Sequence, residues 1–360
     1  MTHANMVSIV SNGYSIHFSQ DGYDFLNRNI KDHNYSKIFI LVDNNSNEYC
    51  LPQLLPMIEA QSEIEIIELE SGEENKTIET CVQIWNVLIE LGADRKSLII
   101  NLGGGVITDM GGFIASTFKR GIAFINIPTT LLSMVDASIG GKNGVDLGGL
   151  KNQIGTITNP EMVIIDSSFL ESLPQNQMRS GLAEMLKHGL IAKKSHWEKF
   201  KNLKEINFDD FDDLIFESIA IKSDIVTQDP TENGIRKALN FGHTLGHAIE
   251  TYFLENPDKT NLLHGEAIAA GMILESYISL QQKLISETEY AQIKTTLNNI
   301  FDKIIITKKE QEDIIKLLIH DKKNEYGKVQ FALLYGIGNI RTNQTTDNET
   351  IIEAFLNYKN

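Results

Sequence analysis

The chain has 360 residues, of which 42% are hydrophobic and 22% are charged, and its formal net charge is -16 at pH 7. This length is sufficient for two domains that each have a core. The acidic balance argues against nucleic acid and anionic membranes as partners, because both carry negative charge. No uninterrupted apolar run approaches the roughly 20 residues that a transmembrane helix needs.

Cysteine content and the first residues predict a cytoplasmic protein. Cys50 and Cys81 are the only cysteines. Two thiols make neither a disulfide framework nor a thiolate metal site, which favours a reducing compartment. The opening stretch MTHANMVSIV lacks the basic segment and apolar run of a signal peptide.

The first half of the chain alternates short apolar runs with helical patterns. Strands rich in Ile, Val or Leu are expected at Lys37–Val42, Glu63–Leu69, Ser97–Leu102, Ala123–Ile127 and Met162–Ile165. Short apolar runs of this kind are typical of buried parallel strands. A helix is expected between the second and third of these runs, at Thr77–Leu91. The alternation predicts an α/β, Rossmann-like domain with a mainly parallel sheet.

The second half has a different pattern. Long helices are expected at Met178–Lys193, Phe211–Gln228, Lys237–Phe253 and Glu266–Leu284, and strand signals nearly vanish until Val329–Leu334. We therefore expect two domains, an α/β domain over residues 1–172 and a mainly α-helical domain over residues 173–360.

A glycine cluster follows the third expected strand. Gly103-Gly104-Gly105-Val106-Ile107-Thr108-Asp109 leads from that strand into a helical stretch. At such a junction, backbone N–H groups and the positive end of a helix dipole can hold a phosphate. The spacing is neither G-x-G-x-x-G nor that of a P-loop, so a tight turn explains it equally well. Asp43 ends the first expected strand, where it is either a ribose ligand or an ordinary turn residue.

A second glycine-rich cluster carries lysines. It comprises Asp136-Ala-Ser-Ile-Gly-Gly-Lys142-Asn-Gly144 and the pair Lys151-Asn152. Cationic side chains beside accessible backbone N–H groups suit a phosphate or a carboxylate. A solvated loop is the usual setting of lysine, but six glycines between Gly140 and Gly155 would make a plain surface loop costly.

A third cluster contains possible metal ligands. His243 and His247 are four residues apart on an expected helix and so share one face. His264 opens the next helical pattern, and Glu184 lies on an earlier one. Imidazole and carboxylate groups bind zinc, and a catalytic zinc site takes three protein ligands and leaves one position open.

A histidine pair at this spacing is more often packed or exposed than bound to metal. The third histidine and the glutamate favour a metal site, although spacing does not decide which three residues bind. Asn240 and Arg236 fall one and two turns before the same face. Arg236 would clamp a carboxylate or a phosphate through two hydrogen bonds, or it is a surface charge.

Five stretches together resemble the 3-dehydroquinate synthase family, and they occur in the family's order from about Asp43 to Gly338. They are GGGVITDMGGFIASTFKRGI, IPTTLLSMVDASIGGKNGVDLGGLKNQIG, RSGLAEMLKHGLI, KALNFGHTLGHAIE and LLHGEAIAAGM. The resemblance implies an N-terminal NAD-binding domain, a C-terminal domain that binds metal and substrate, and an active site between them.

The same resemblance implies site residues. Zinc, or alternatively cobalt, would be held by Glu184, His243 and His264. NAD would contact Asp43, Glu73, Lys76, Gly104, Gly105, Val106, Asp109, Thr129, Thr130 and Lys151. Substrate would contact Arg120, Asp136, Lys142, Asn152, Lys187, Lys222, Arg236, Asn240 and His247. Either Lys322 or Lys323 would also reach the substrate, and Ser180 replaces an amide that some members have near the nicotinamide.

The implied activity is the conversion of 3-deoxy-D-arabino-heptulosonate 7-phosphate to 3-dehydroquinate and phosphate in the shikimate pathway. NAD is transiently reduced, phosphate is eliminated, and an intramolecular aldol addition closes the ring, with the metal as a Lewis acid. The substrate is a polyanion, which explains so many implied lysine and arginine contacts in an acidic protein. Homodimers are common in the family.

Three other interpretations stay open. Another sugar-phosphate cyclase, such as 2-deoxy-scyllo-inosose synthase, would change the anion-facing stretches, whereas Asp109, Lys142 and Arg236 fit the dehydroquinate pattern. A glycerol-dehydrogenase-like, metal-dependent alcohol dehydrogenase would consume NAD stoichiometrically, and that family lacks the lysine pattern of the second cluster. A non-catalytic binding protein is disfavoured by the intact set of three possible metal ligands.

Overall fold

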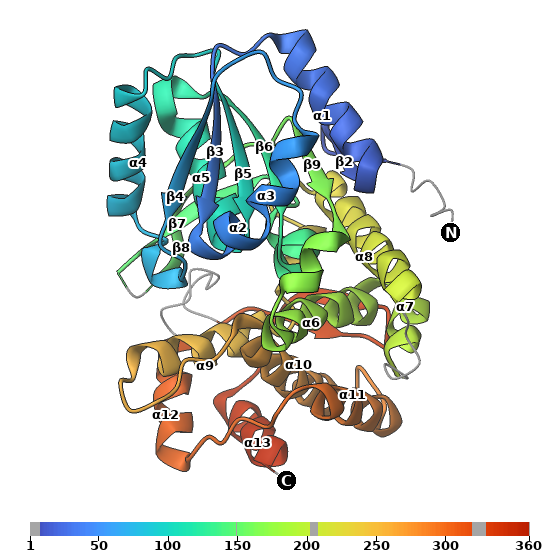
Figure 1. Cartoon of the computed structure of the whole chain (residues 1–360). Helices are drawn as coiled ribbons and strands as arrows, with labels where there is room; N and C mark the ends of the chain where they lie inside the picture. Colours follow the sequence, from blue (N-terminus) through green and yellow to red (C-terminus); the bar gives the residue numbers. More distant parts are fainter. Residues whose placement is uncertain (1–7, 149, 202–207, 319–328, 360) are drawn as a thin grey trace. The chain divides into compact units, whose positions relative to one another are not determined.

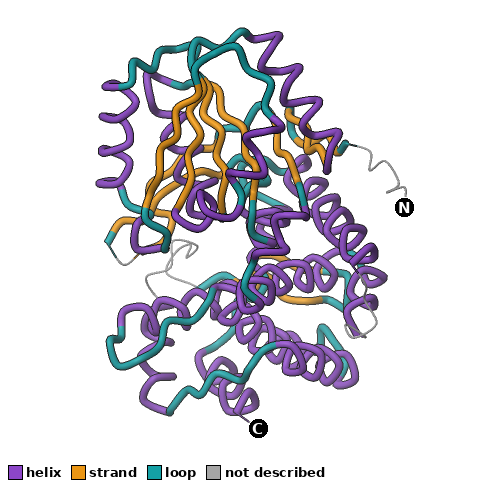
Figure 2. Tube along the Cα trace, in the orientation of Figure 1, coloured by secondary structure: helices purple, strands orange, loops and turns teal. Residues whose placement is uncertain are grey.

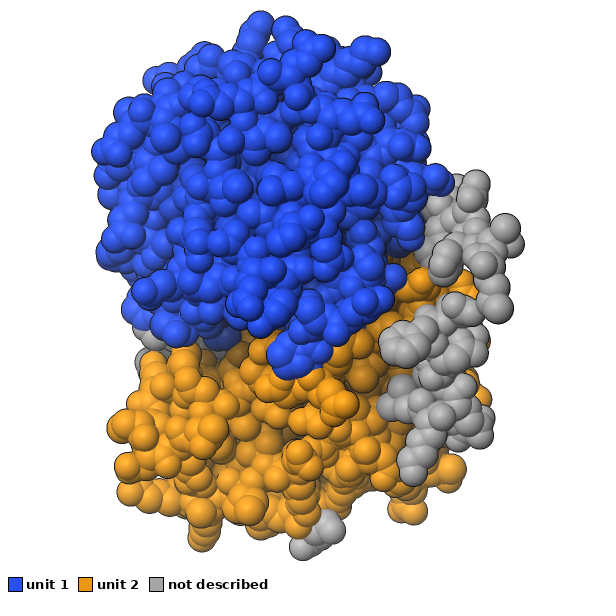
Figure 3. All heavy atoms as spheres, in the orientation of Figure 1, with its two compact units in different colours: residues 1–174 blue, residues 175–360 orange. Residues whose placement is uncertain are grey.

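The computed structural model describes residues 8–148, 150–201, 208–318 and 329–359. The chain divides into two compact units, Met1–Pro174 and Gln175–Asn360 (Figure 3). The first unit contains a mostly parallel sheet with helices, and the second is mainly helical, which confirms the expected fold class. The expected division after residue 172 falls close to this boundary, and the binding role of each unit stays a proposal.

A sheet forms the centre of the first unit, where its strands are coloured orange (Figure 2). It has seven strands in the order β1-β2-β9-β6-β5-β3-β4. Its strands are β1 (Ile9–Ser11), β2 (Tyr14–Phe18), β3 (Ile38–Asp43), β4 (Ile64–Leu69), β5 (Leu98–Gly103), β6 (Ala123–Pro128) and β9 (Met162–Ile165). Neighbouring strands are parallel except β1 and β2, which are antiparallel. The apolar runs of β3 and β5 are buried, as is typical of a sheet covered on both faces.

Helices and short turns connect these strands. The helices are α1 (Ser19–His33), α2 (Asn44–Tyr49), α3 (Leu51–Leu54), α4 (Ile78–Glu90) and α5 (Gly105–Thr117). The turns are η1 (Leu55–Met57), η2 (Glu73–Asn75), η3 (Phe118–Arg120), η4 (Ser133–Ala137) and η5 (Ser167–Ser172). Helices α4 and α5 bury their apolar faces in a shared core with the sheet, through residues such as Leu88, Ile114 and Phe124.

The strand order reverses between β3 and β5. These strands are neighbours, but the chain leaves β3 towards β4 on one side and leaves β5 towards β6 on the other. The carboxyl ends of such a pair flank a crevice, which is where open α/β sheets bind ligands. Asp43 ends β3 and Gly103 ends β5, so two of the expected cofactor-binding stretches begin at this crevice.

The second glycine-rich cluster forms a hairpin that the sequence did not predict. Strands β7 (Lys142–Leu147) and β8 (Leu150–Ile157) pair antiparallel in a separate two-stranded sheet. Gly144 lies opposite Gly155, and a Cβ atom on Gly155 would stand 2.4 Å from the Asn143 carbonyl oxygen. Glycine is needed here because the two backbones approach too closely for side chains.

The second unit is built around helix α10 (His264–Gln281), which packs against α6, α9, α11 and α13 (Figure 1). Its other helices are α6 (Gln175–Ala192), α7 (Lys194–Lys199), α8 (Phe208–Gln228), α9 (His243–Glu255), α11 (Glu287–Ile300), α12 (Lys308–Leu317) and α13 (Asn348–Lys359), with a turn η7 (Ile235–Asn240). Strands β10 (Phe331–Leu334) and β11 (Ile340–Gln344) pair antiparallel. None of the described helices is long and apolar enough to span a membrane.

The predicted bounds of one helix were wrong. Lys237–Phe253 was expected to be continuous, but the 3₁₀ turn η7 ends at Asn240 and α9 begins only at His243. The break lies at Gly242, whose φ of 77° no ordinary helix contains. Arg236 and Asn240 therefore do not share a helix with His243, and His243 lies in the first turn of α9.

Candidate functional site

Backbone groups after β5 form the floor of the crevice in the first unit. Gly104 is the N-cap of α5, and the Thr129 N–H donates to the Gly103 carbonyl at 3.0 Å. A Cβ atom on Gly104 would stand 3.1 Å from Thr130 Cγ2, so the turns after β5 and β6 pack closely. The first N–H groups of α5, at Gly105 and Val106, have no acceptor within the helix and lie at its positive end. They suit a diphosphate.

Asp43 has a structural role at the end of β3. Its Oδ1 accepts the Ser46 N–H at 2.8 Å, and the Ser46 hydroxyl accepts the Asp43 N–H at 2.8 Å. This capping box starts α2 and fixes the carboxylate at the carboxyl end of β3. The turn interpretation and the ribose interpretation are compatible, because a carboxylate accepts hydrogen bonds on two oxygens.

A buried ion pair joins three segments beside the crevice. Lys76 is only 3% exposed, and its Nζ donates to Asp109 Oδ2 at 2.7 Å and to Asn152 Oδ1 at 2.8 Å. Burial by itself lowers the pKa of Lys76, but Asp109 and Glu73 outweigh it and raise that pKa. The ammonium group therefore stays charged and ties the segment after β4 to α5 and to the β7–β8 hairpin.

The hairpin adds a second ion pair to this arrangement. Lys151 Nζ lies 3.3 Å from Glu73 Oε1, and the Asn152 N–H donates to Asp146 Oδ1 at 2.6 Å. The structure thus brings together five of the expected site residues, which we call the crevice network. They are Glu73, Lys76, Asp109, Lys151 and Asn152.

The remaining expected residues of the first unit lie on separate segments. Asp136 is partly buried in the π-helical turn η4, a conformation found mainly at functional sites. Burial chiefly raises the pKa of Asp109, and the charge of the Asp136 carboxylate acts in the same direction. Lys142 is exposed at the start of β7, and Arg120 is exposed at the end of η3.

In the second unit, a carboxylate and two imidazoles converge. Glu184 on α6 is 0% exposed, and its Oε1 lies 3.5 Å from His243 Nε2 and 3.6 Å from His264 Nε2. These distances are long for hydrogen bonds. Two ligands of one tetrahedral zinc ion with bonds of about 2.0–2.1 Å stand about 3.3 Å apart, which is close to the distances observed.

The surroundings of Glu184 also suit a cation. The Lys187 ammonium forms an ion pair with Oε2, whereas Oε1, which faces the two imidazoles, has no hydrogen-bond donor among the described residues. A fully buried carboxylate is costly unless positive charge compensates it. The donor set therefore fits a divalent metal ion.

Acceptors on the far side of each imidazole orient its ring. His243 Nδ1 lies 3.1 Å from the Phe241 carbonyl oxygen, and His264 Nδ1 lies 3.3 Å from Glu250 Oε2. An acceptor at Nδ1 holds the ring proton there and leaves the Nε2 lone pair for a metal. Burial alone lowers the pKa of His264, but Glu250 and Glu184 outweigh it and raise that pKa to about 9. The two carboxylates thus favour positive charge at His264, and a bound metal ion would supply that charge in place of the proton on Nε2.

His247 offers an alternative ligand. Its ring centroid lies 5.0 Å from that of His243 and 5.7 Å from that of His264. Ligand atoms of the three histidines lie within 4.8 Å of one another, so a three-histidine set is available. Glu184 is the stronger third ligand, because its Oε1 faces both imidazoles while Lys187 pairs with Oε2, and a carboxylate offsets more of the charge of a divalent ion than a third neutral imidazole does.

Two acidic residues that contact expected site residues were not predicted from the sequence. Glu250 is seven residues after His243, so both lie on one face of α9, and this periodicity is a signal that could have identified it. Glu232 accepts a hydrogen bond from Asn240 Nδ2 at 2.8 Å and has a φ of 63°, which is unusual for a residue other than glycine. No motif in the sequence pointed to Glu232.

The other expected residues of the second unit include buried cations. Lys222 on α8 and Arg236 in η7 are buried, and Arg236 Nη1 donates to the Pro230 carbonyl at 2.7 Å. Ser180 on α6 accepts the Gly265 N–H at 2.9 Å, so it holds the backbone beside His264. Lys322 and Lys323 lie outside the described residues.

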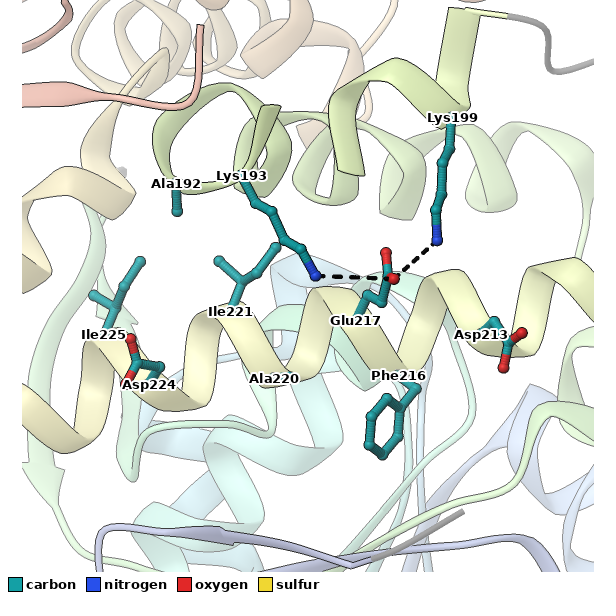
Figure 4. Close-up of a pocket in the computed structure, with 10 residues that line it drawn as sticks. All are labelled: Ala192, Lys193, Lys199, Asp213, Phe216, Glu217, Ala220, Ile221, Asp224 and Ile225. Atoms are coloured by element: carbon teal, nitrogen blue, oxygen red, sulfur yellow. Dashed lines mark hydrogen bonds and ion pairs between the residues drawn. The ribbon is translucent and has the colours of Figure 1, made fainter. Parts of the chain in front are cut away.

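A cavity of about 660 Å³ lies in the second unit between α7 and α8, and none of the expected site residues that the structure describes lines it. Figure 4 shows Lys193 and Lys199 reaching Glu217, whose carboxylate lies 3.9 Å and 2.8 Å from their ammonium groups. Asp213 and Asp224 also line the cavity, so its two lysines stand among three carboxylates, and the cavity offers no net positive charge to an anionic ligand.

His196 beside this cavity is expected to make the protein less stable in acid. Burial lowers the pKa of His196 more strongly than Glu217, bonded to its Nδ1 at 3.0 Å, raises it. The folded state then binds fewer protons than the unfolded state, so stability is lost as the pH falls below about 6.5. Urea unfolding gives the free energy of unfolding at about pH 7.5 and at about pH 5.5. Between these two values, that free energy should fall less for His196→Gln than for the unaltered protein. Equal losses would contradict this role.

Two family models match the chain, and 3-dehydroquinate synthases are among its relatives. The models for the N-terminal and C-terminal parts of 3-dehydroquinate synthase match residues 66–180 and 181–324. The 3-dehydroquinate synthase of Parabacteroides distasonis is 42% identical over 328 residues, covering 90% of this chain and 92% of that protein. That of Sulfurovum sp. is 39% identical over 321 residues, covering 89% of this chain and 90% of that protein.

Solved structures of sugar-phosphate cyclases share the fold. A 2-deoxy-scyllo-inosose synthase complexed with carbaglucose-6-phosphate, NAD+ and Co2+ is 26% identical, with a TM-score of 0.84 over 97% of this chain and 98% of that one. A 2-epi-5-epi-valiolone synthase from Streptomyces hygroscopicus subsp. jinggangensis, with NAD+ and Zn2+ bound, is 23% identical, with a TM-score of 0.84 over 98% and 99%. These cyclases are more distant than the relatives at 42% and 39%. The chain belongs to the 3-dehydroquinate synthase family.

Proposed function

We propose that the chain converts 3-deoxy-D-arabino-heptulosonate 7-phosphate to 3-dehydroquinate and phosphate. The observation that carries this proposal is the convergence of Glu184, His243 and His264 in a chain that matches the family over most of its length. The enzyme would be a carbon–oxygen lyase acting on a phosphate, which releases the phosphate group by elimination and not by hydrolysis.

NAD and a divalent ion, zinc or cobalt, are the proposed cofactors. One carboxylate and two imidazoles form a donor set that suits zinc, and cobalt accepts the same ligands. When bound, the divalent ion would supply Lewis acidity to substrate hydroxyls, and NAD would accept and return a hydride. The backbone at the start of α5 would hold the NAD diphosphate, and Asp43 would bind a ribose. Thr129, Thr130 and the crevice network would complete this site.

Buried cations of the second unit would hold the acidic groups of the substrate. Lys187, Lys222 and Arg236 are each at most 5% exposed. They provide local positive charge within a protein of net charge -16, and a polyanion is the ligand that such charge attracts. His247 and Asn240 would order a hydroxyl or a water molecule for proton transfer. Further substrate contacts are proposed for Arg120, Asp136, Lys142 and Asn152 of the first unit.

The proposed activity also implies what the chain binds and where it acts. A small anionic sugar-acid phosphate is the proposed binding partner, without nucleic acid or membrane. A homodimer in the cytoplasm is the proposed state of the enzyme.

A phosphate-release assay tests the function. The heptulosonate phosphate and glucose 6-phosphate are supplied in separate reactions, each with and without NAD and with and without a chelator. We expect phosphate only from the heptulosonate phosphate, with NAD and metal both required and no net NADH formed. Turnover of glucose 6-phosphate alone would identify a different cyclase. In a separate reaction with NAD and a simple alcohol, accumulation of NADH would identify a dehydrogenase.

A further inference from the structure

Glu275 on α10 is a buried acidic residue to which the proposed function gives no role. It is 0% exposed and lies in the core of the second unit. Its Oε2 accepts the Gly242 N–H at 2.7 Å, and its Oε1 accepts the Leu245 N–H at 3.0 Å. Both oxygens therefore bind the first turn of α9, where backbone N–H groups have no acceptor within the helix.

These two hydrogen bonds lie on either side of His243. Gly242 is the N-cap of α9, and Leu245 is the third residue of the helix, so Glu275 binds the backbone just before and just after the histidine. A carboxylate at this end is also favoured by the helix dipole. Two attachment points fix both the position and the rotation of the turn, and hence the direction in which the His243 side chain leaves the backbone.

Close packing between α9 and α10 supports the same arrangement. A Cβ atom on Gly271 would stand 2.0 Å from the Gly242 carbonyl oxygen, and one on Gly242 would stand 2.5 Å from Met272 Cγ. Glu275 follows Gly271 by one helical turn, so one face of α10 provides both the close approach and the two acceptors. The start of α9 is therefore pressed against α10 and hydrogen-bonded to it.

We propose that Glu275 is a positioning residue for the metal site, which holds the first turn of α9 so that His243 Nε2 faces Glu184. The inference rests on the proposed function only through that metal site. Ligand distances in a well-formed protein metal site lie within about 0.2 Å of their standard values. A turn that is released from α10 would therefore weaken metal binding even where the fold persists.

The test compares Glu275→Gln with the unaltered protein after removal of metal. Glutamine keeps the shape of the side chain but replaces one acceptor with a donor that faces a backbone N–H. Competition between the protein and a chelator for Co2+ gives the dissociation constant, and urea unfolding of the metal-free protein gives stability. We expect affinity to fall about 10- to 100-fold, as for other residues that orient metal ligands, with an altered Co2+ absorption spectrum.

Ile278→Val is the matched control, because Ile278 is buried on the same helix and its replacement leaves Glu275 with both acceptor oxygens. It should lower stability and leave Co2+ affinity and spectrum unchanged. Unchanged affinity in Glu275→Gln, with stability lowered as in the control, would overturn the proposal. If the glutamine variant does not fold, Glu275→Asp is measured instead, and unchanged affinity there overturns it equally. Failure of the unaltered protein to bind Co2+ would count against the metal site itself.

Discussion

Replacing Glu184 with glutamine is expected to lower the rate of phosphate release on the order of a thousandfold. The change removes the negative charge from the carboxylate whose Oε1 lies 3.5 Å and 3.6 Å from the two imidazoles. It also leaves the buried Lys187 ammonium without its counter-charge. A Lewis-acid contribution of several kcal/mol would be lost, and each 1.4 kcal/mol is about tenfold in rate. Phosphate release and zinc per chain, by elemental analysis, measure the effect.

Glu217→Gln is the control for this experiment. Glu217 is also a helical glutamate that pairs with lysines, but it lies at the cavity between α7 and α8. Its replacement should change stability slightly and leave zinc content and activity intact. A Glu184→Gln protein that retains a full complement of zinc and normal turnover would show that this carboxylate is not a ligand.

Replacing Lys76 with methionine is expected to destabilise the first unit by about 3 kcal/mol, because it removes one partner of a buried ion pair. The side chains of Lys76 and Asp109 are 4% and 17% exposed, so water would compensate Asp109 poorly. The hydrogen bond to Asn152 is also lost, which loosens the β7–β8 hairpin. Urea unfolding measures the stability, and fluorescence titration with NADH measures cofactor affinity, which should also fall.

A double variant distinguishes the stability that is lost through an unpaired buried charge from the loss of cofactor affinity. Lys76→Met with Asp109→Asn removes the uncompensated carboxylate, so it should recover part of the stability lost by the single variant. Cofactor affinity should stay low, because the crevice network is still broken. A single variant as stable as the unaltered protein would mean that the ion pair contributes nothing to the fold.

Strands of the parallel sheet could be predicted because their burial on both faces demands unbroken apolar runs, as in β3 and β5. The β7–β8 hairpin could not, since the glycines required for close backbone approach at Gly144 and Gly155 interrupt its apolar pattern. The break at Gly242 was missed for a related reason. A single glycine is tolerated within a helical pattern, and its positive φ follows only from packing against α10.

Residue type and family resemblance identified the three candidate metal ligands, but not the groups that orient them. Glu275 is 33 residues from Gly242 and 30 from Leu245, so no local spacing connects them. Its relation to His243 arises from the crossing of α9 and α10. Glu250 could have been found from the periodicity of α9, whereas its approach to His264 depends on α10.

A crystal structure of the zinc-loaded protein, with anomalous diffraction recorded at the zinc edge, tests the metal centre directly. One strong peak is expected about 2.0–2.2 Å from a Glu184 carboxylate oxygen and from Nε2 of His243 and His264. A peak bound by His247 in place of Glu184, or no peak beside these side chains, would contradict the proposed site.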